Sequence, residues 1–296
     1  MNPVFVDIPY FIPFTFTSVD DDARLQSTVS IPYNVAIYGI TIAASSAIQS
    51  SFYRANLQFI DYTTGDTLFD EPMSNWCIQS DARTYWKLPS KWFVQKNSKI
   101  VCTLDSADGV VATTYYITLL AHVVSADPNP GLQPFSYSFP ISVGFQDNIG
   151  GTTTGQPFNQ QVTGTLAKHM LHDFDIHAIV FNSQSQGLAF PIMSFQLSTQ
   201  NRKLFDRALI AGVAGGGSVY GQGDTIRWMA GSAFSPYGFP ADSILQWKLP
   251  KPERVFKGEL VRVDVAPAPT YIATDPIHNL FDEVTCFAVI GNHVDG

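Results

Sequence analysis

The densest group of possible metal ligands in this sequence is a short run just past the middle of the chain. It contains His169, His172, Asp173, Asp175 and His177. Imidazole and carboxylate side chains are the groups with which proteins hold divalent cations. In an extended strand successive side chains point to opposite faces, so Asp173, Asp175 and His177 are expected on one face. The first hypothesis is therefore that this face binds a divalent cation.

The alternative is that this face is simply the polar, solvent-facing side of a half-buried strand. The first half of the chain contains a similar segment, in which Asn34, Ala36 and Tyr38 stand at the aligned positions. Those residues cannot supply the same ligand set. We therefore favour the polar strand face and predict that the chain has no metal ligands.

Other sequence patterns for catalysis or cofactor binding are missing. The acidic run at 20–22 lacks the alternating ligands and glycine turn of a calcium loop. The glycine-rich stretch at 212–223 lacks the Lys-Ser/Thr of a phosphate-binding loop. Neither a GxSxG nor an HExxH motif occurs. We predict no catalytic residue and no cofactor, and expect that the protein is not an enzyme. His122 and His293 remain candidates for pH-sensitive interface groups.

The composition favours strands. Only 14% of the 296 residues are charged, while 19 prolines and 21 glycines are available to separate short elements. The three cysteines, Cys77, Cys102 and Cys286, have neither disulfide-framework nor zinc spacing, so buried thiols are expected. No apolar run is long enough for a membrane span, and the first residues lack the pattern of a signal peptide. Folding in a cytoplasm is therefore expected.

The net charge of −8 argues against a nucleic-acid-binding surface, because affinity for phosphate comes largely from clustered lysine and arginine. The 17 basic residues look scattered along the sequence. We expect no direct binding of nucleic acid, although the sequence does not show how charge is distributed over the folded surface.

One pattern occurs twice in the chain, which indicates a tandem duplication. A Trp-Lys-Leu-Pro sequence is followed in each half by an alternating apolar run, and a Leu-Phe pair precedes it in each half. The repeated positions, which we expect to be structural, are Trp86, Leu88, Pro89, Leu68 and Phe69 in the first half and Trp247, Leu249, Pro250, Leu204 and Phe205 in the second. We interpret Leu-Pro as a strand or turn boundary.

The repeats define the expected domains. Residues 1–126 form a first domain, 127–134 a proline-rich linker and 135–296 a second domain with longer loop insertions. Short alternating segments at spacings of about 8–12 residues indicate an all-β fold of two tandem antiparallel β-sandwiches. A jelly roll is favoured for each, and an immunoglobulin-like topology stays open.

The order of these positions resembles that of bacteriophage virion structural proteins. It is carried by Leu68-Phe69, Leu88-Pro89 and Lys96 and by their second-half counterparts. Two such domains in one chain are similar in layout to the double jelly-roll major capsid proteins of icosahedral viruses. The resemblance implies a homotrimer in which six barrels make a pseudo-hexagonal tile, with other virion proteins as further partners.

The function expected on this basis is that of a self-assembling capsid structural protein, located in the virion and made and assembled in the host cytoplasm. The alternative is a capsid decoration, vertex or tail receptor-binding protein with a lectin-like β-sandwich. In that role Tyr220, Trp228 and Tyr237 would stack on sugar rings.

Overall fold

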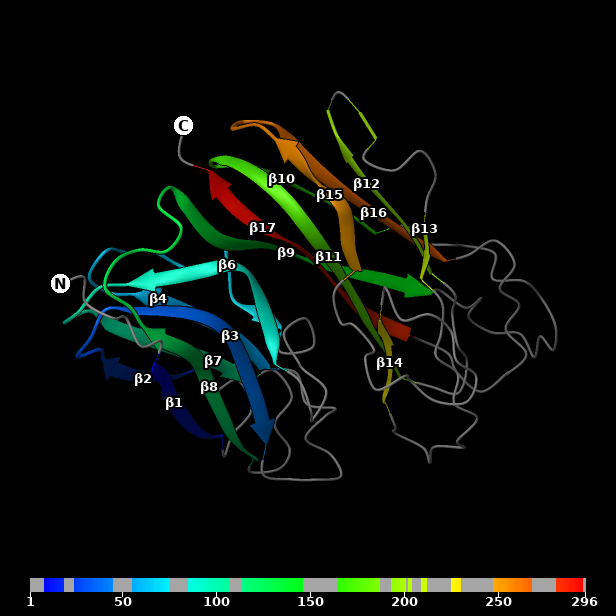
Figure 1. Ribbon diagram of the computed structural model, residues 1–296. Coiled ribbons are helices and arrows are strands. Elements are labelled where there is room, and N and C mark those ends of the chain that lie inside the picture. The colour runs from blue at the N-terminus through cyan, green and yellow to red at the C-terminus, as the bar shows by residue number, and fades with distance from the viewer. Residues whose placement is uncertain are drawn as a thin grey trace. The chain divides into compact units, whose positions relative to one another are not determined.

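The computed structural model describes residues 8–18, 24–44, 55–74, 85–106, 113–145, 164–186, 193–200, 202–203, 209–211, 225–229, 247–267 and 281–294. Every regular element within these ranges is a strand. Figure 1 shows the strands as arrows, coloured from blue at the N-terminus to red at the C-terminus. The expected all-β class is therefore confirmed.

The first eight strands form two antiparallel sheets. Their pairing orders are β1-β8-β3-β6 and β2-β7-β4-β5, so the chain crosses repeatedly between the sheets and the first strand pairs with the eighth. This is the jelly-roll arrangement and not the immunoglobulin-like one. The strands are β1 Ile8–Ser18, β2 Arg24–Ser30, β3 Val35–Ala44, β4 Ala55–Asp61, β5 Met73–Ser74, β6 Trp86–Val94, β7 Lys99–Ser106 and β8 Thr113–Val123.

Alternating apolar residues of these strands make the core between the two sheets. Ile12, Phe14 and Phe16 of β1 are all buried, while the residues between them face outward. A chain of edge-on aromatic contacts then links the strands. The Phe14 and Phe59 ring centroids lie 6.2 Å apart, Phe59 and Phe69 6.0 Å, and Phe69 and Trp86 6.0 Å. Aromatic pairs of this kind add to the stabilisation from burial alone.

Pro89 shows where the sequence interpretation was wrong. Leu88-Pro89 lies inside β6 and does not mark a strand boundary. In the pairing of β3 with β6, Ile37 lies opposite Trp92 but Gly39 lies opposite Lys87, so β6 bulges between these rungs. Because β6 is the last strand of its sheet, the missing N–H of the proline costs little in this bulge.

The later strands repeat this arrangement. One sheet has the order β10-β16-β12-β13; in the other, β9-β17-β11 continues to both β14 and β15, which pair with β11. The order matches the first jelly roll strand for strand, with β14 as an addition along residues 182–186 of β11. The strands are β9 Leu132–Phe145, β10 Gly164–His169, β11 Asp173–Gln186, β12 Met193–Thr199, β13 Leu209–Ala211, β14 Thr225–Met229, β15 Trp247–Val255, β16 Leu260–Pro267 and β17 Phe281–Val294.

The chain divides into two compact units that do not follow the sequence in simple order. Unit 1 comprises Met1–Ser138, Asp173–His177 and Val289–Gly296, and unit 2 comprises Phe139–His172 and Ala178–Ala288. The first residues of β9 belong to unit 1, because the Ser136 N–H donates to the Leu68 carbonyl at 3.0 Å and the Ser136 carbonyl accepts from the Asp70 N–H at 3.2 Å. The expected boundary at 126 and linker at 127–134 remain a prediction.

The repeated positions lie as follows. Leu68, Phe69, Trp86 and Leu88 are buried and Pro89 is half-buried. In β15, Leu249 is half-buried and Pro250 is exposed, while the side chain of Trp247 and the whole of Leu204 and Phe205 lie outside the described residues. The equivalence of the two sets remains a prediction.

Candidate functional site

The His/Asp run adopts the expected alternation at the start of β11. Phe174 and Ile176 are fully buried, whereas Asp173, Asp175 and His177 on the opposite face are half-buried. His169 and His172 precede the strand and are exposed, and the His169 Nδ1 lies 3.2 Å from the Gly258 carbonyl. Within the described ranges, no three His, Cys, Asp or Glu residues are grouped closely enough to hold a metal ion.

His177 belongs instead to a chain of polar side chains within unit 1. The Ser90 hydroxyl donates to Asn292 Oδ1 at 2.6 Å, and Asn292 Nδ2 lies 3.1 Å from His177 Nε2. With the amide oriented in this way, Asn292 donates and His177 accepts, so the imidazole is neutral. Desolvation by burial lowers the pKa of His177, and the nearby Asp175 carboxylate opposes this shift.

His293 is part of the unit 1 core. Its ring stacks on Phe135 with centroids 4.0 Å apart, its Nε2 lies 3.2 Å from the Tyr137 hydroxyl, and Phe174 packs against it edge-on. His122, by contrast, lies on the outer face of β8. Its ring packs against Tyr38 at 4.8 Å, and its Nδ1 is buried without a hydrogen-bond partner.

The remaining sequence candidates give no site. Cys102 is a fully buried free thiol, and desolvation raises its pKa strongly, which makes it unreactive. Residues 20–22, 212–223, Cys77, Tyr220 and Tyr237 lie outside the described part of the chain, as do the side chains of Trp228 and Cys286.

The sequence did not reveal an uncharged face over three strands, β1, β8 and β3, of a four-stranded sheet. On the fourth strand, β6, the exposed Lys87 lies opposite Gly39 and borders this face. Residues from the three strands line up in rungs, and none of them is Asp, Glu, Lys or Arg. The rungs are Thr17–Thr114, Thr15–Tyr116–Ala43, Pro13–Thr118–Thr41, Phe11–Leu120–Gly39 and Pro9–His122–Ala36.

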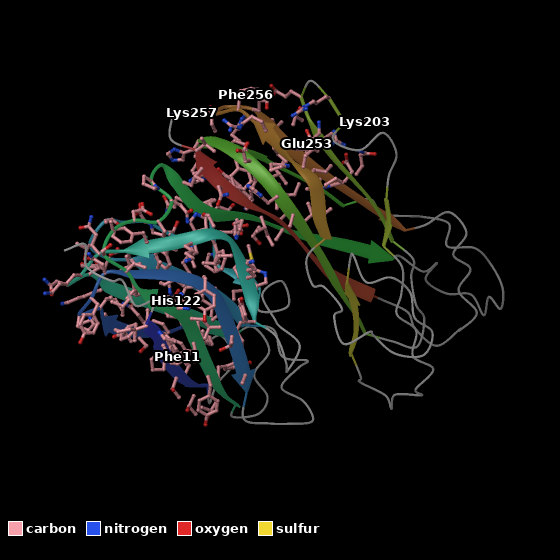
Figure 2. All side chains as sticks on the ribbon, viewed as in Figure 1. Phe11, His122, Lys203, Glu253, Phe256 and Lys257 are labelled. Carbon is pink, nitrogen blue, oxygen red and sulfur yellow. The ribbon has the colours of Figure 1, made fainter. Side chains whose placement is uncertain are left out.

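Two large apolar side chains stand out from this uncharged face. Phe11 is 59% exposed and Tyr116 is 49% exposed. Figure 2 shows Phe11 and His122 labelled on this part of unit 1. The outer face of the other sheet is different, because it carries the Arg24–Asp105 ion pair with the Arg24 Nε 3.6 Å from Asp105 Oδ1. An exposed sheet face normally carries charges. The uncharged face is therefore a candidate interaction surface.

A second surface feature lies at one end of unit 2, where the turn between β15 and β16 meets the ends of β10 and β12. The Met170 N–H donates to the Glu259 carbonyl at 2.9 Å, and the Gly258 N–H donates to the Met170 carbonyl at 2.8 Å. These backbone bonds fix the β10–β11 turn beside the β15–β16 turn. We call residues 168–172, 199–200, 202–203 and 253–260 the basic tip.

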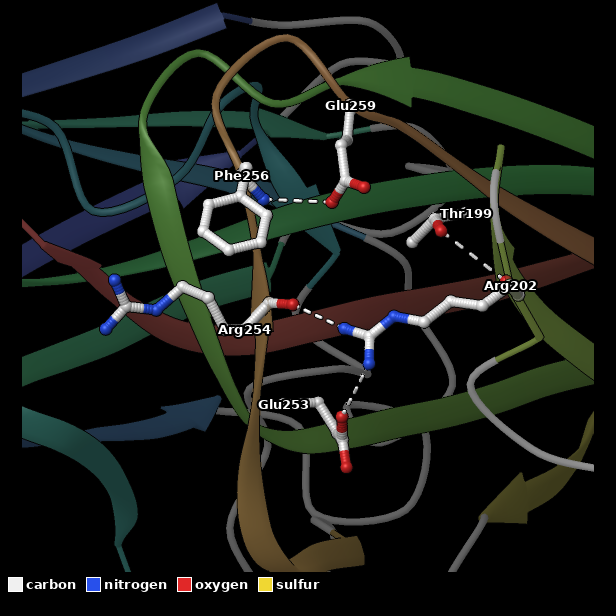
Figure 3. Close-up of polar contacts among 6 residues, drawn as sticks. All are labelled: Thr199, Arg202, Glu253, Arg254, Phe256 and Glu259. Atoms are coloured by element: carbon white, nitrogen blue, oxygen red, sulfur yellow. Dashed lines mark hydrogen bonds and ion pairs between the residues drawn. The ribbon is translucent and has the colours of Figure 1, made fainter.

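Arg202 ties the end of β12 to β15 in the basic tip. Its guanidinium donates to Glu253 Oε2 at 3.4 Å and to the Arg254 carbonyl at 2.5 Å (Figure 3). The Phe256 N–H donates to Glu259 Oε2 at 2.9 Å, which closes the β15–β16 turn. Five of the 17 basic residues, which are scattered along the sequence, are therefore gathered at one place by the fold.

The strand order defines the chain as a protein of two tandem jelly rolls, each built from two antiparallel sheets. The resemblance to double jelly-roll proteins is thus confirmed at the level of fold. No protein-family model matches the sequence, and no curated protein matches it either.

Solved structures with a similar arrangement come from capsids and from an enzyme. The major capsid protein P2 from bacteriophage PM2 is 10% identical, with a TM-score of 0.41 over 98% of each chain. The STIV MCP is 10% identical, with a TM-score of 0.38 over 97% of this chain and 96% of the other. Peptide N-glycanase F is 11% identical, with a TM-score of 0.39 over 96% of each chain. These TM-scores are too low to carry an argument about function.

One prediction has to be corrected. The expectation that this protein is not an enzyme is contradicted, because an N-glycanase and an asparagine amidase are among the matched structures. Missing sequence motifs do not by themselves exclude catalysis, because active sites are recognised by the geometry and roles of their residues.

Proposed function

We propose that this chain is a structural subunit of a viral shell and that it associates with copies of itself through the uncharged face of unit 1. The observation that carries the proposal is the set of five rungs without a charged residue, from which Phe11 and Tyr116 protrude. Interfaces between proteins are depleted in charge and enriched in aromatic residues at their centre. Jelly rolls are a common architecture of capsid proteins.

The size of the uncharged face limits what it can do alone. Nine residues of β1 span about 30 Å, and three paired strands span about 14 Å, which gives a face of about 400 Å². A stable protein interface buries about 800 Å² on each partner. The uncharged face would therefore form the centre of a contact that extends onto neighbouring loops.

A closed trimer is the assembly that we favour. It rests on the resemblance of the repeated sequence pattern to double jelly-roll coat proteins, together with the presence of two jelly rolls in one chain. Contacts between unlike surfaces of successive copies close into a ring when the rotation permits. Within this proposal the chain arose by tandem duplication, is assembled in the host cytoplasm with other virion proteins, and resides in the virion.

The test is the oligomeric mass of the purified protein, measured by light scattering over a range of concentrations. The double variant Phe11→Arg/Tyr116→Arg is expected to lower the mass toward that of a monomer, because it places two charges at the centre of the contact. Tyr62→Arg is the matched control, since Tyr62 is a 74% exposed aromatic residue outside the uncharged face. Equal masses for both variants would contradict the proposal, and so would a wild-type monomer at all concentrations.

A second candidate function is that of a decoration, vertex or tail receptor-binding protein that recognises glycans. Exposed rings such as Phe11 and Tyr116 are also suitable for stacking on sugars. A glycan array distinguishes the two functions. Binding that Phe11→Arg/Tyr116→Arg removes, in a protein that stays monomeric, would favour this second function.

A further inference from the structure

The basic tip of unit 2 differs in charge from the rest of the chain. It contains five basic residues and two acidic ones, whereas the whole chain has 17 basic and 25 acidic residues. The basic residues of the tip are Lys168, Arg202, Lys203, Arg254 and Lys257. An excess of positive charge in a protein of net charge −8 indicates that this end meets a negatively charged partner.

The basic tip also exposes two large apolar side chains. Leu171, in the β10–β11 turn, is 61% exposed, and Phe256, in the β15–β16 turn, is 57% exposed. Lys257 follows Phe256 directly, and Figure 2 shows both at the β15–β16 turn, with Lys203 also labelled in unit 2. Apolar side chains on tight turns among basic groups are the combination that binds at a membrane interface. The apolar groups enter the headgroup region and the cations attract anionic lipids.

The turns hold these side chains in place. Gly258 has a φ of 84°, which suits glycine in the β15–β16 turn, and the Glu259 N–H donates to the Phe256 carbonyl at 3.0 Å. The backbone bonds between Met170 and residues 258–259 fix the turn that carries Leu171. Little conformational entropy is therefore lost when the basic tip meets a surface.

We propose that the basic tip docks on an anionic lipid bilayer. Nucleic acid is the other large polyanion, and a ring such as Phe256 can stack on an unpaired base, but neither phosphates nor bases give a role to the exposed aliphatic side chain of Leu171. One copy carries a small excess of charge, so its own affinity is modest. Many copies held side by side would bind much more strongly through avidity. The inference concerns unit 2 and does not rest on the proposed role in a shell.

The experiment is vesicle flotation of the full chain with neutral phosphatidylcholine vesicles and with vesicles that also contain phosphatidylglycerol. We expect binding to the anionic vesicles only, and weaker binding at high salt. The charge-reversal variant Lys203→Glu/Lys257→Glu is expected to lower the bound fraction at least about tenfold. The matched control is Lys96→Glu/Lys99→Glu, which changes the net charge equally at two exposed residues of unit 1.

A second variant tests insertion separately from charge. Phe256→Ser keeps every charge of the basic tip and is expected to weaken binding to anionic vesicles while melting at the wild-type temperature, because Phe256 is largely exposed. The proposal would be overturned if anionic vesicles bound no protein, or if the control variant lost as much binding as the charge-reversal variant. Binding to duplex DNA without binding to vesicles would overturn it too, and would assign the basic tip to nucleic acid.

Discussion

At the scale of single residues, one of the side chains that suggested metal binding, His177, takes part in the packing of unit 1. His177 accepts a hydrogen bond from Asn292, which in turn accepts one from Ser90, so three residues distant in sequence form one polar chain. A protonated His177 could not accept this bond, and the Asn292 amide would have to turn over. The neutral imidazole is therefore the form that fits the native structure.

The lowered pKa of His177 predicts a loss of stability in acid. Its ordinary value is 6.5, so as the pH falls through that value the unfolded chain takes up a proton that native His177 resists. The free energy of unfolding should therefore fall as the pH drops below about 6.5, and recover when the pH is raised again. Thermal melting above and below this pH should show a shallower fall for His177→Gln. His172→Gln, at an exposed position, is the control and should follow wild type.

Gly291 in β17 lies against the start of β11, where there is no room for a larger side chain. A Cβ atom added there would lie within 1.9 Å of the Asp175 carbonyl oxygen and 2.7 Å of Phe174 Cζ. Because the Asp175 carbonyl oxygen is a backbone atom, it can move away only if the strand itself shifts, which costs free energy. Gly291→Ala should destabilise the protein by about 3 kcal/mol in chemical denaturation.

Gly39→Ala is the comparison for this prediction. The nearest atoms there belong to the ring of Tyr85, which is 39% exposed and can move aside. This variant should cost clearly less than Gly291→Ala. Equal losses would mean that β17 shifts to accommodate the extra methyl group.

At the scale of elements, the edges of the first jelly roll carry prolines. Among the described strands β1 pairs only with β8, and Pro9 and Pro13 alternate along it with the exposed Phe11. Proline in an edge strand removes N–H donors from the open side, which makes it harder for other chains to add strands. Association through the uncharged face is then kept to side-chain contacts.

Replacing these prolines should open the edge. Pro9→Thr/Pro13→Thr is expected to aggregate faster than wild type on incubation, as followed by light scattering and thioflavin T fluorescence, because β1 gains donors and becomes a better template for strand pairing. Pro32→Thr, at an exposed loop position, is the control. If it aggregates as fast as the double variant, edge protection is not the cause.

At the scale of the whole molecule, unit 1 is completed by segments from much later in the chain. Unit 1 runs from Met1 to Ser138 and also includes Asp173–His177 and Val289–Gly296. The Ser138 N–H donates to Asp70 Oδ1 at 2.8 Å, which adds to the bonds that Ser136 makes with Leu68 and Asp70.

A pair of fragments tests the boundary. Residues 1–138 should melt at a higher temperature than residues 1–126, because the longer fragment keeps the hydrogen bonds of Ser136 and Ser138. Three such bonds correspond to about 3 kcal/mol. Circular dichroism on both fragments measures the difference. Identical melting would place the boundary at 126, as the sequence predicts.

The sequence alone determined the class of fold, because its signals are local. Alternation of apolar and polar residues marks strands whatever their partners, as in Ile12, Phe14 and Phe16, and the repeated Trp-Lys-Leu-Pro pattern predicted two tandem domains. The opposite faces of Phe174 and His177 followed from the same period of two. The position of Pro89 inside β6 did not follow from this period, because the bulge that accommodates it depends on the partner strand β3.

Only the tertiary structure decided which residues share a surface. The uncharged face requires the register of β1, β8 and β3, and Thr17 contacts Thr114 across 97 residues of sequence. The basic tip likewise joins Arg202 to Glu253, 51 residues apart. Pairing between strands this far apart in sequence is set by the packing of the whole sandwich. A short stretch of sequence therefore does not reveal it. Strands can thus be recognised in the sequence, whereas the surfaces they build together appear only in the fold.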